Sequence, residues 1–358
     1  MSAAPAAGAG RIWGWDLLRG LCALAVMAYH LLLWLDLASL HTLGSYGVYL
    51  FFVLSGASLA HTYARRLGSA PAVASFFVLR WLRLTPLFVV AALLSVALFS
   101  VRAGQLVDQL PLRLALNLTY AFGVVDPVIW ALPIGGWSLG IEWVFYAAFP
   151  LLLPLLRHGT LRWGVLAAAV ALQVFWIQRT VGAAGGYDAH ATAYHHAPAF
   201  GAYFVAGCLI GLHTRARGMT GHPATAGAAA AGLLALLLVL NPATAGPHLL
   251  GVPGVLLPLV CALTVWISGR AAVPARWHGL ARWMGDITYG SYLLHPLLFF
   301  GLTWLVLPDL PASTGGRVAL ALAVGAAACL AAVASERWLE SPVRRWAYGR
   351  TRRWLGAG

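Results

Sequence analysis

The sequence contains no lysine: all 23 of its basic residues are arginine, against only 10 acidic residues. This absence excludes Schiff-base chemistry on a lysine, such as the attachment of pyridoxal phosphate. Cysteine is scarce too, and the four cysteines stand singly within apolar runs, without the spacing of a metal site or a disulfide framework. Charged residues make up 9% of the 358 residues and hydrophobic residues 61%, which is outside the soluble globular range. The composition therefore predicts an integral membrane protein.

Ten runs of apolar residues reach the length of a membrane-spanning helix, about 20 residues. They cover 15–35, 45–64, 84–101, 136–156, 162–179, 198–214, 223–240, 249–268, 286–307 and 317–336. A further run, 112–133, contains Asn117, Asp126 and two prolines, and we expect it to form a partly helical surface segment. The predicted fold is all-α, a polytopic transmembrane bundle of about ten helices over 15–345, with an N-terminal tail (1–14) and a basic C-terminal tail (346–358).

The arginines between these runs predict the orientation. Of the 23 arginines, Arg19 lies within a run, four (Arg102, Arg113, Arg179 and Arg317) fall on one side, and the other 18 fall on the side of both termini. Because arginine-rich loops remain in the cytoplasm, both termini are predicted to be cytoplasmic, in a multi-pass protein of the inner or plasma membrane. A spanning helix at 112–133 would translocate thirteen of these arginines. Since they sit in short loops between apolar runs, they do not indicate a nucleic-acid partner.

The first run carries three ionisable residues. Such residues inside a membrane are costly unless they face a protein interior or a water-filled cavity, so they indicate a functional site. Asp16 and Arg19 are three residues apart and can pair on a helix. Arg19 and His30 are eleven apart, which places both on nearly the same helix face, roughly 16 Å from each other. The alternative is that Asp16 and Arg19 mark the membrane interface and His30 is a hydrogen-bonded core histidine.

Later runs add further polar residues. Arg80 and Arg83, at i, i+3 spacing, can grip phosphate oxygens in bidentate fashion, or they simply anchor the chain at the cytoplasmic face. The fourth run contains Trp137, Ser138, Glu142 and Tyr146, and the ninth contains Tyr289, Tyr292 and His295. Asp188, His190, His195 and His196 lie in a translocated loop, where a solvated loop is a simpler interpretation than a metal site.

Six stretches, in this order, resemble the acyltransferase 3 family of integral membrane acyltransferases, many of which O-acylate extracytoplasmic carbohydrates. They are Arg19-x10-His30, the FFVLSG stretch from Phe51 to Gly56 with Ser55, Arg80-x-x-Arg83, Trp137 to Tyr146, Thr288 to His295, and Glu340-x-Pro342. The resemblance extends from Trp15 to Arg345. It implies transfer of an acyl group, often acetyl, from cytoplasmic acyl-CoA as cosubstrate to a hydroxyl of a cell-envelope carbohydrate, a glycolipid or a related acceptor. It implies no permanently bound cofactor and no metal.

The resemblance also implies roles for the residues. His30 takes a proton from the attacking hydroxyl or is itself transiently acylated. Arg19, Arg80 and Arg83 bind the phosphates or the developing charge of the donor. Glu142 orients His30 or binds sugar hydroxyls, unless it is a structural partner of an arginine or tryptophan. The supporting residues are Asp16, Ser55, Trp137, Ser138, Tyr146, Tyr289, Tyr292 and His295.

Helix geometry predicts that His30 and Glu142 lie at similar depth. His30 lies roughly 22 Å inward from Trp15, and Glu142 roughly 9 Å below the outer surface near Gly136, at 1.5 Å per residue. In a core about 30 Å thick the two depths nearly coincide. We therefore expect one site, with side chains within about 12 Å of each other. A secondary transporter would also carry such residues, but we find no internal repeat and no broken-helix pattern. A membrane sensor on the same fold is the third possibility.

Overall fold

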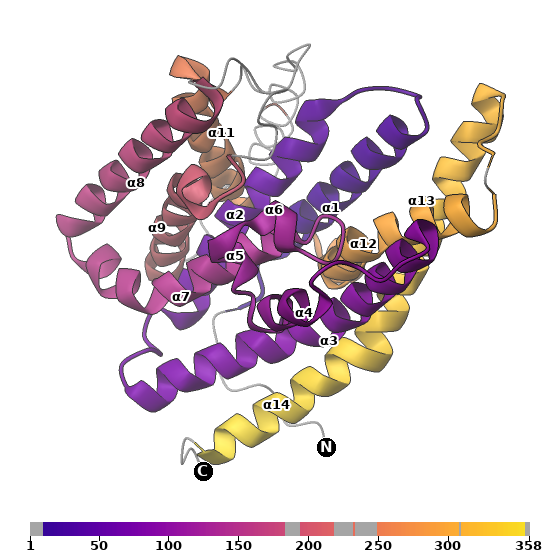
Figure 1. The fold of residues 1–358 in the computed structure, drawn as a ribbon. Helices are drawn as coiled ribbons and strands as arrows, with labels where there is room; N and C mark the ends of the chain where they lie inside the picture. Colours follow the sequence, from indigo (N-terminus) through magenta and orange to yellow (C-terminus); the bar gives the residue numbers. More distant parts are fainter. Residues whose placement is uncertain (1–9, 183–193, 218–231, 233–248, 308, 355–358) are drawn as a thin grey trace.

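The computed structural model describes residues 10–182, 194–217, 232, 249–307 and 309–354, and every regular element within these ranges is helical (Figure 1). The α-helices are α1 (Trp13–Trp34), α2 (His41–Tyr63), α3 (Ala70–Ala103), α4 (Leu110–Thr119), α5 (Phe122–Val125), α6 (Pro127–Trp130), α7 (Trp137–Arg157), α8 (Leu161–Ile177), α9 (Gly201–Arg217), α11 (Gly251–Arg270), α12 (His278–Leu305), α13 (Thr314–Ser335) and α14 (Ser341–Trp354). Short 3-10 or π-helical segments are η1 (Gln178–Gly182), η3 (Ala197–Phe200), η5 (Ala275–Trp277) and η6 (Glu336–Glu340).

Eight helical segments in the described part of the chain are long and apolar enough to cross a membrane. They correspond to α1, α2, α3, α7, α8 with η1, η3 with α9, α11, and the stretch from α13 to α14. The predicted all-α, multi-pass fold is thus confirmed. The predicted span 223–240 and the centre of the loop 180–197 lie outside the described residues, so the count of ten stays a prediction. As expected, 112–133 contains only the short helices α4, α5 and α6 within it or at its edge.

The predicted span 286–307 overlaps α12, which covers it up to Leu305; α12 has 28 residues but is not among the eight apolar segments. Its hydropathy is lowered by polar residues that face other helices, including Ser291 and His295, which are 0% and 1% exposed. α12 packs against α1, α13 and α3. A polar helix is stable at this position because protein surrounds it on several sides, and it brings Tyr289, Tyr292 and His295 into the interior.

Two helices, α2 and α9, approach each other unusually closely. A Cβ added at Gly56 would lie 2.2 Å from the Phe204 carbonyl oxygen, and one at Gly207 would lie 2.1 Å from that of Val53. Small residues at such crossings let helix backbones meet in a membrane, where water does not drive association. The glycine that ends the FFVLSG stretch, Gly56, therefore has a packing role. This contact fixes α2, which carries Ser55, against the rest of the bundle.

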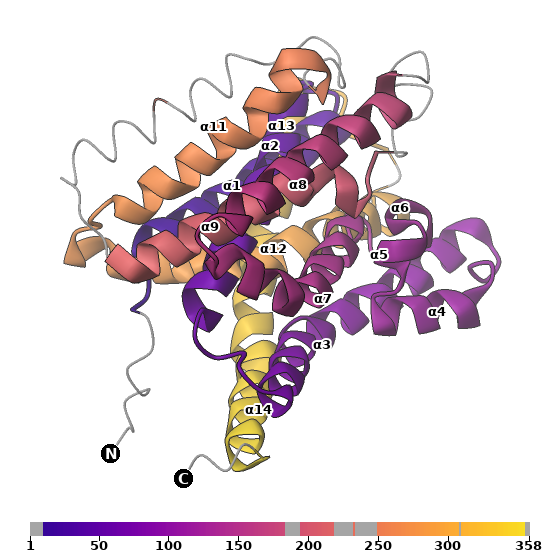
Figure 2. The same ribbon diagram turned by 90° about the vertical axis from the view of Figure 1, so that its left-hand side faces the viewer.

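The helix α3 is longer than its predicted span, 84–101. It begins at Ala70 because Ser69 caps it, accepting a hydrogen bond from the Ala72 N–H, and because Pro71 suits a first turn. Its 34 residues extend about 51 Å, well beyond a hydrocarbon core of about 30 Å. Arg80 and Arg83 therefore lie on a helix that protrudes from the bundle. The last helix, α14, packs along it in a region where the sequence predicted a basic tail (346–358) (Figure 2).

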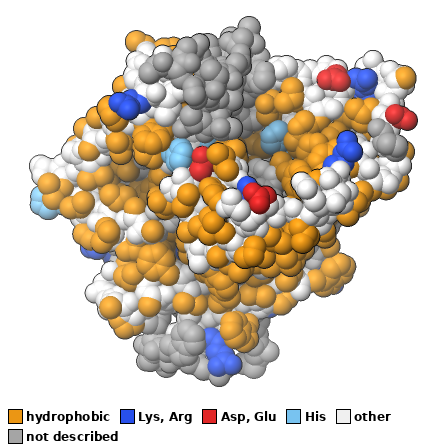
Figure 3. Space-filling model, in the orientation of Figure 1, with side chains coloured by type: hydrophobic (Ala, Val, Ile, Leu, Met, Phe, Trp, Pro, Cys, Tyr) orange, Lys and Arg blue, Asp and Glu red, His pale blue; other side chains and the backbone are white. Residues whose placement is uncertain are grey.

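The surface suits a lipid environment. Figure 3 shows hydrophobic side chains over most of the visible face, with few charged groups among them. Large apolar side chains such as Leu151 and Leu322 are 77% and 70% exposed. In water, apolar side chains exposed on this scale would promote aggregation, whereas in a membrane they contact the acyl chains of lipids.

Candidate active site

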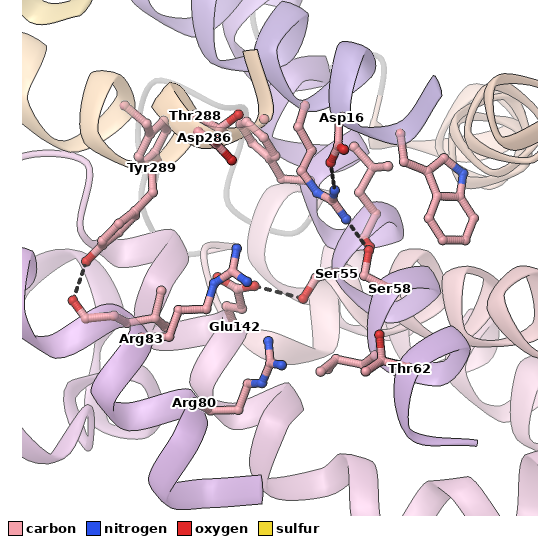
Figure 4. Close-up of a pocket in the computed structure, with 18 of the residues that line it drawn as sticks. Asp16, Ser55, Ser58, Thr62, Arg80, Arg83, Glu142, Asp286, Thr288 and Tyr289 are labelled. Atoms are coloured by element: carbon pink, nitrogen blue, oxygen red, sulfur yellow. Dashed lines mark hydrogen bonds and ion pairs between the residues drawn. The ribbon is translucent and has the colours of Figure 1, made fainter. Parts of the chain in front are cut away.

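A cavity of about 540 Å³ lies among α1, α2, α3, α7, α12, η6 and α14 (Figure 4). Ten predicted site residues line it: Asp16, Arg19, Ser55, Arg80, Arg83, Ser138, Glu142, Tyr146, Tyr289 and Tyr292. The segment just before α1 contributes Arg11 to this cavity, and α14 contributes Arg344 and Tyr348. His30, His295 and Trp137 are not among its lining residues. The structure thus divides the predicted site into a charged cavity and a separate histidine pair.

The predicted pair on the first helix is present. Arg19 Nη1 donates to Asp16 Oδ1 at 2.9 Å, and Arg19 Nη2 donates to the hydroxyl of Ser58. Arg11 also pairs with Asp16, and its Nη2 lies 3.2 Å from Asp286 Oδ1. Partial burial acts to lower the pKa of Arg11, but its hydrogen bond to Asp16 and the charge of Asp286 raise that pKa above its usual value. This end of the cavity is a network in which arginines and carboxylates balance each other.

Arg80 and Arg83 are three residues apart but lie in different surroundings. The guanidinium of Arg80 packs against the rings of Tyr63 and Tyr146, with its Cζ 5.2 and 5.9 Å from their centroids. It donates to Tyr63 Oη at 3.1 Å, while its Nε is buried without a partner. Arg83 is exposed, points into the cavity, and has no ion-pair partner among the described residues. Of the two, Arg83 is the cation left available to a ligand.

Glu142 faces the cavity from α7. Its Oε1 accepts hydrogen bonds from Ser55 Oγ at 2.8 Å and from Tyr146 Oη at 2.5 Å. Tyr146 lies one helical turn further along α7, whereas Ser55 comes from α2. These two hydroxyls are the hydrogen-bond partners that the structure gives Glu142, so its predicted role toward His30 or sugar hydroxyls stays a prediction, as does the alternative of a structural partner of an arginine or tryptophan. The hydrogen-bond partner that the structure gives to His30 is His295 rather than Glu142, so a single site for His30 and Glu142 stays a prediction.

Tyr292 connects the cavity with the histidine pair. Its hydroxyl bonds with Ser138 Oγ at 2.8 Å and donates to the Gly135 carbonyl oxygen at 2.9 Å. Gly135 has φ +77°, a conformation that favours glycine and that turns this carbonyl toward Tyr292. The rings of Tyr292 and His295 are 6.4 Å apart, one turn along α12. Tyr289, in turn, donates to the Leu84 carbonyl oxygen at 2.7 Å and ties α12 to α3.

His30 and His295 form a hydrogen-bonded pair between α1 and α12. His30 Nδ1 and His295 Nε2 are 2.9 Å apart, and His295 Nδ1 is 2.9 Å from the Ser291 carbonyl oxygen. A carbonyl can only accept, so His295 Nδ1 carries a hydrogen, and in a neutral ring its Nε2 is then an acceptor. His30 must therefore donate from Nδ1. This assignment leaves His30 Nε2 without a hydrogen, ready to accept a proton.

Aromatic rings hold this pair. His30 stacks on Trp34, with centroids 4.8 Å apart and planes 3° from parallel, and Trp34 contacts Phe299 at 5.0 Å.

Trp137 lies away from this pair, with its ring centroid 4.2 Å from that of His195. His196 contacts Trp176 at 5.4 Å. The described part of the chain contains no cluster of ligands that could hold a metal ion.

Sequence reasoning did not assign several charged residues of the cavity wall to the site, although Glu340 belongs to one of the six motif stretches. Glu336 accepts hydrogen bonds from Arg344, and Glu340 accepts one from Ser335 Oγ at 2.8 Å. Both carboxylates belong to the π-helical turn η6, and Asp286 lies opposite on α12. For Glu336 and Glu340 the signal was the cluster of charges at the end of the last apolar run, and for Asp286 it was a carboxylate at the start of the ninth run.

These features define a class of protein: a multi-pass membrane protein that keeps arginines, carboxylates and a histidine pair within its helical bundle. A family model described as an acyltransferase domain matches residues 12–336. The chain therefore belongs to the acyltransferase 3 family, as its motifs indicated, and it is a membrane acyltransferase. No curated protein and no solved structure matches the chain.

Proposed function

We propose that the protein transfers an acyl group, acetyl in the simplest case, from cytoplasmic acyl-CoA to a hydroxyl of a cell-envelope carbohydrate or related acceptor. The observation that carries this proposal is that the charged cavity reaches Tyr292. Tyr292 lies one helical turn from His295, which is hydrogen-bonded to His30. The donor enters from the end where α1 begins and α14 lies. Its thioester reaches the region of Ser138, Glu142 and Tyr292.

In this proposal His30 is the general base. Its Nε2 takes the proton of the acceptor hydroxyl while that oxygen attacks the thioester carbonyl. The carbon–sulfur bond then breaks, and the departing sulfur receives the proton from His30, so that the products are the ester and free CoA. Arg83 and the hydroxyls near Glu142 stabilise charge on the donor as it reacts. Transient acylation of His30 is the alternative, which a trapped acyl-enzyme would distinguish.

The test uses the purified protein in vesicles with labelled acetyl-CoA and cell-envelope glycans. We expect label in the glycan, release of CoA, and loss of both with His30→Ala or Glu142→Ala in protein that remains folded. The double variant should be no slower than either single variant if both residues serve one site. Uptake of label into the vesicle lumen without an acylated product would instead favour the transporter.

His30→Ala also addresses the sensor. An acyltransferase depends on its proton acceptor, since a general base contributes about 10²–10⁴ to the rate. A cellular phenotype that survives His30→Ala would refute the proposed activity. Mass spectrometry of cell-envelope glycans, with and without the protein, would identify the acceptor.

A further inference from the structure

A second cavity, of about 980 Å³, adjoins the first. It is formed by the residues before α1 and by the ends of α2, α7, α8 and α9 that lie on the same side. Gly10, Arg11, Ile12 and His61 line both cavities. A long ligand can therefore occupy both by passing this shared edge.

The two cavities differ in charge. The first has five arginines and five carboxylates among its described lining residues: Arg11, Arg19, Arg80, Arg83 and Arg344 against Asp16, Glu142, Asp286, Glu336 and Glu340. The second has six arginines and, among the described residues that line it, no carboxylate: Arg11, Arg65, Arg157, Arg162, Arg215 and Arg217. Orientation of the protein requires arginines on this side of the membrane. Arg11 is paired with Asp16 and Asp286. Orientation does not require that the other five, which lie just after α2 and on α7, α8 and α9, enclose a cavity with no carboxylate in its described lining.

Some of these arginines already have structural partners, and others do not. Arg215 Nη1 donates to the His61 carbonyl oxygen at 3.1 Å and so joins α9 to α2. Arg162 has a buried Nε without a partner, although its Cζ lies 5.4 Å from the Trp163 ring centroid. Arg65 and Arg157 are exposed at the ends of α2 and α7. Buried donors are normally satisfied, and guanidinium groups bind phosphate oxygens in bidentate fashion, so this lining suits a ligand with several phosphates.

We infer that the second cavity binds the phosphates of the nucleotide end of acyl-CoA, while the pantetheine arm crosses the shared edge into the first cavity. This inference rests on the proposed function. Self-repulsion among unpaired arginines is relieved by a polyanion, whereas in the first cavity Asp16, Glu336 and their neighbours would repel one. Arg83 then contacts the arm or the thioester rather than the distant phosphates. Of the two roles that the sequence predicts for Arg19, Arg80 and Arg83, phosphate binding or stabilisation of developing charge, this inference favours the second for Arg83.

The test compares two donors and two neighbouring arginines. S-acetylpantetheine keeps the thioester and the arm of acetyl-CoA but lacks the nucleotide. Arg65 lines the second cavity, whereas Arg66, which is next in the chain and also exposed, lines neither of the two cavities. Arg65→Glu combined with Arg157→Glu should raise KM for acetyl-CoA about tenfold or more and leave KM for S-acetylpantetheine within about twofold. Arg66→Glu, the matched control, should change neither.

A parallel rise in KM for both donors, or an unchanged KM for acetyl-CoA, would overturn the inference. A binding measurement separates it from the proposed activity: adenosine 3′,5′-bisphosphate should raise the melting temperature of the unaltered protein and not of the Arg65→Glu/Arg157→Glu variant. If neither donor transfers its acyl group but this shift is present, the proposed function fails while the phosphate site stands. An anionic lipid headgroup offers the same phosphate chemistry. Thermal stabilisation by phosphatidylglycerol in phosphatidylcholine vesicles, lost in the variant and not reproduced by the bisphosphate, would assign the cavity to lipid instead.

Discussion

The histidine pair gives a prediction in which two similar substitutions should have different effects. Asparagine at position 295 places its amide nitrogen near the position of His295 Nδ1, so His295→Asn can still donate to the Ser291 carbonyl oxygen. It offers nothing to His30. Glutamine reaches the position of His295 Nε2, so His295→Gln can present its carbonyl oxygen to the N–H at His30 Nδ1.

The expected loss of rate depends on whether His295 only packs or also positions His30. If it only packs, His295→Asn loses one neutral hydrogen bond, which lowers stability by about 1 kcal/mol and costs at most about fivefold in rate. If it holds His30 in the tautomer with Nε2 free, the variant loses much of the general-base contribution, which is about 10²–10⁴. We expect a fall of at least about 10² for His295→Asn and of less than about tenfold for His295→Gln.

The assay is release of CoA from acetyl-CoA under saturating donor and acceptor, measured across pH for the unaltered protein and both variants. His295→Gln should keep the pH profile of kcat, while His295→Asn should displace it, because His30 then has no fixed tautomer. Thermal unfolding of each variant checks that folding is intact. Equal losses in the two variants, or losses of about fivefold or less in both, would refute the positioning role.

Two further predictions concern single side chains. Arg83→Ala should raise KM for acetyl-CoA and for S-acetylpantetheine alike without lowering the melting temperature. Arg80→Ala should also destabilise the protein, because it removes the contacts with aromatic rings. Arg83→Lys should restore donor use incompletely, since an ammonium lacks the bidentate fork. Gly207→Val should destabilise the bundle by about 1–3 kcal/mol or more, since its Cβ would meet the Val53 carbonyl oxygen at 2.1 Å. Gly201→Val, in open space on the same helix, is the control, and equal melting temperatures would contradict this explanation.

Contacts within one helix were predictable from the sequence. The Asp16–Arg19 ion pair follows from a spacing of three residues, and the Tyr146–Glu142 hydrogen bond lies within one turn of a run already predicted to be helical. The apolar runs predicted most of the helices for the same reason, since the length and hydropathy of a segment are local properties.

Contacts between helices were not predictable in this way. His30 and His295 are separated by 265 positions, and no spacing rule brings α1 and α12 together. The hydrogen bond from Ser55 to Glu142 likewise joins two distant segments and forms only when the helices pack. Motif resemblance named these residues, but their pairing depends on which faces of the helices pack. The second cavity was hidden for a different reason, because its arginines come from separate loops that each look like ordinary orientation signals.

The π-helical turn η6 decides where the end of the chain can lose a residue. A π-helical turn contains an extra residue compared with an α-helical turn. Deleting one residue between Glu336 and Glu340 would let the turn close as an ordinary α-helix and leave the rotation of α14 relative to α13 unchanged, because the extra residue is the one removed. Deleting one residue from the α-helical part of α13 would instead rotate α14 by about 100° relative to the start of α13, and Arg344 and Tyr348 would then leave the cavity wall. In aligned sequences of working relatives, one-residue gaps in this region should therefore fall within the five positions of η6 rather than in α13.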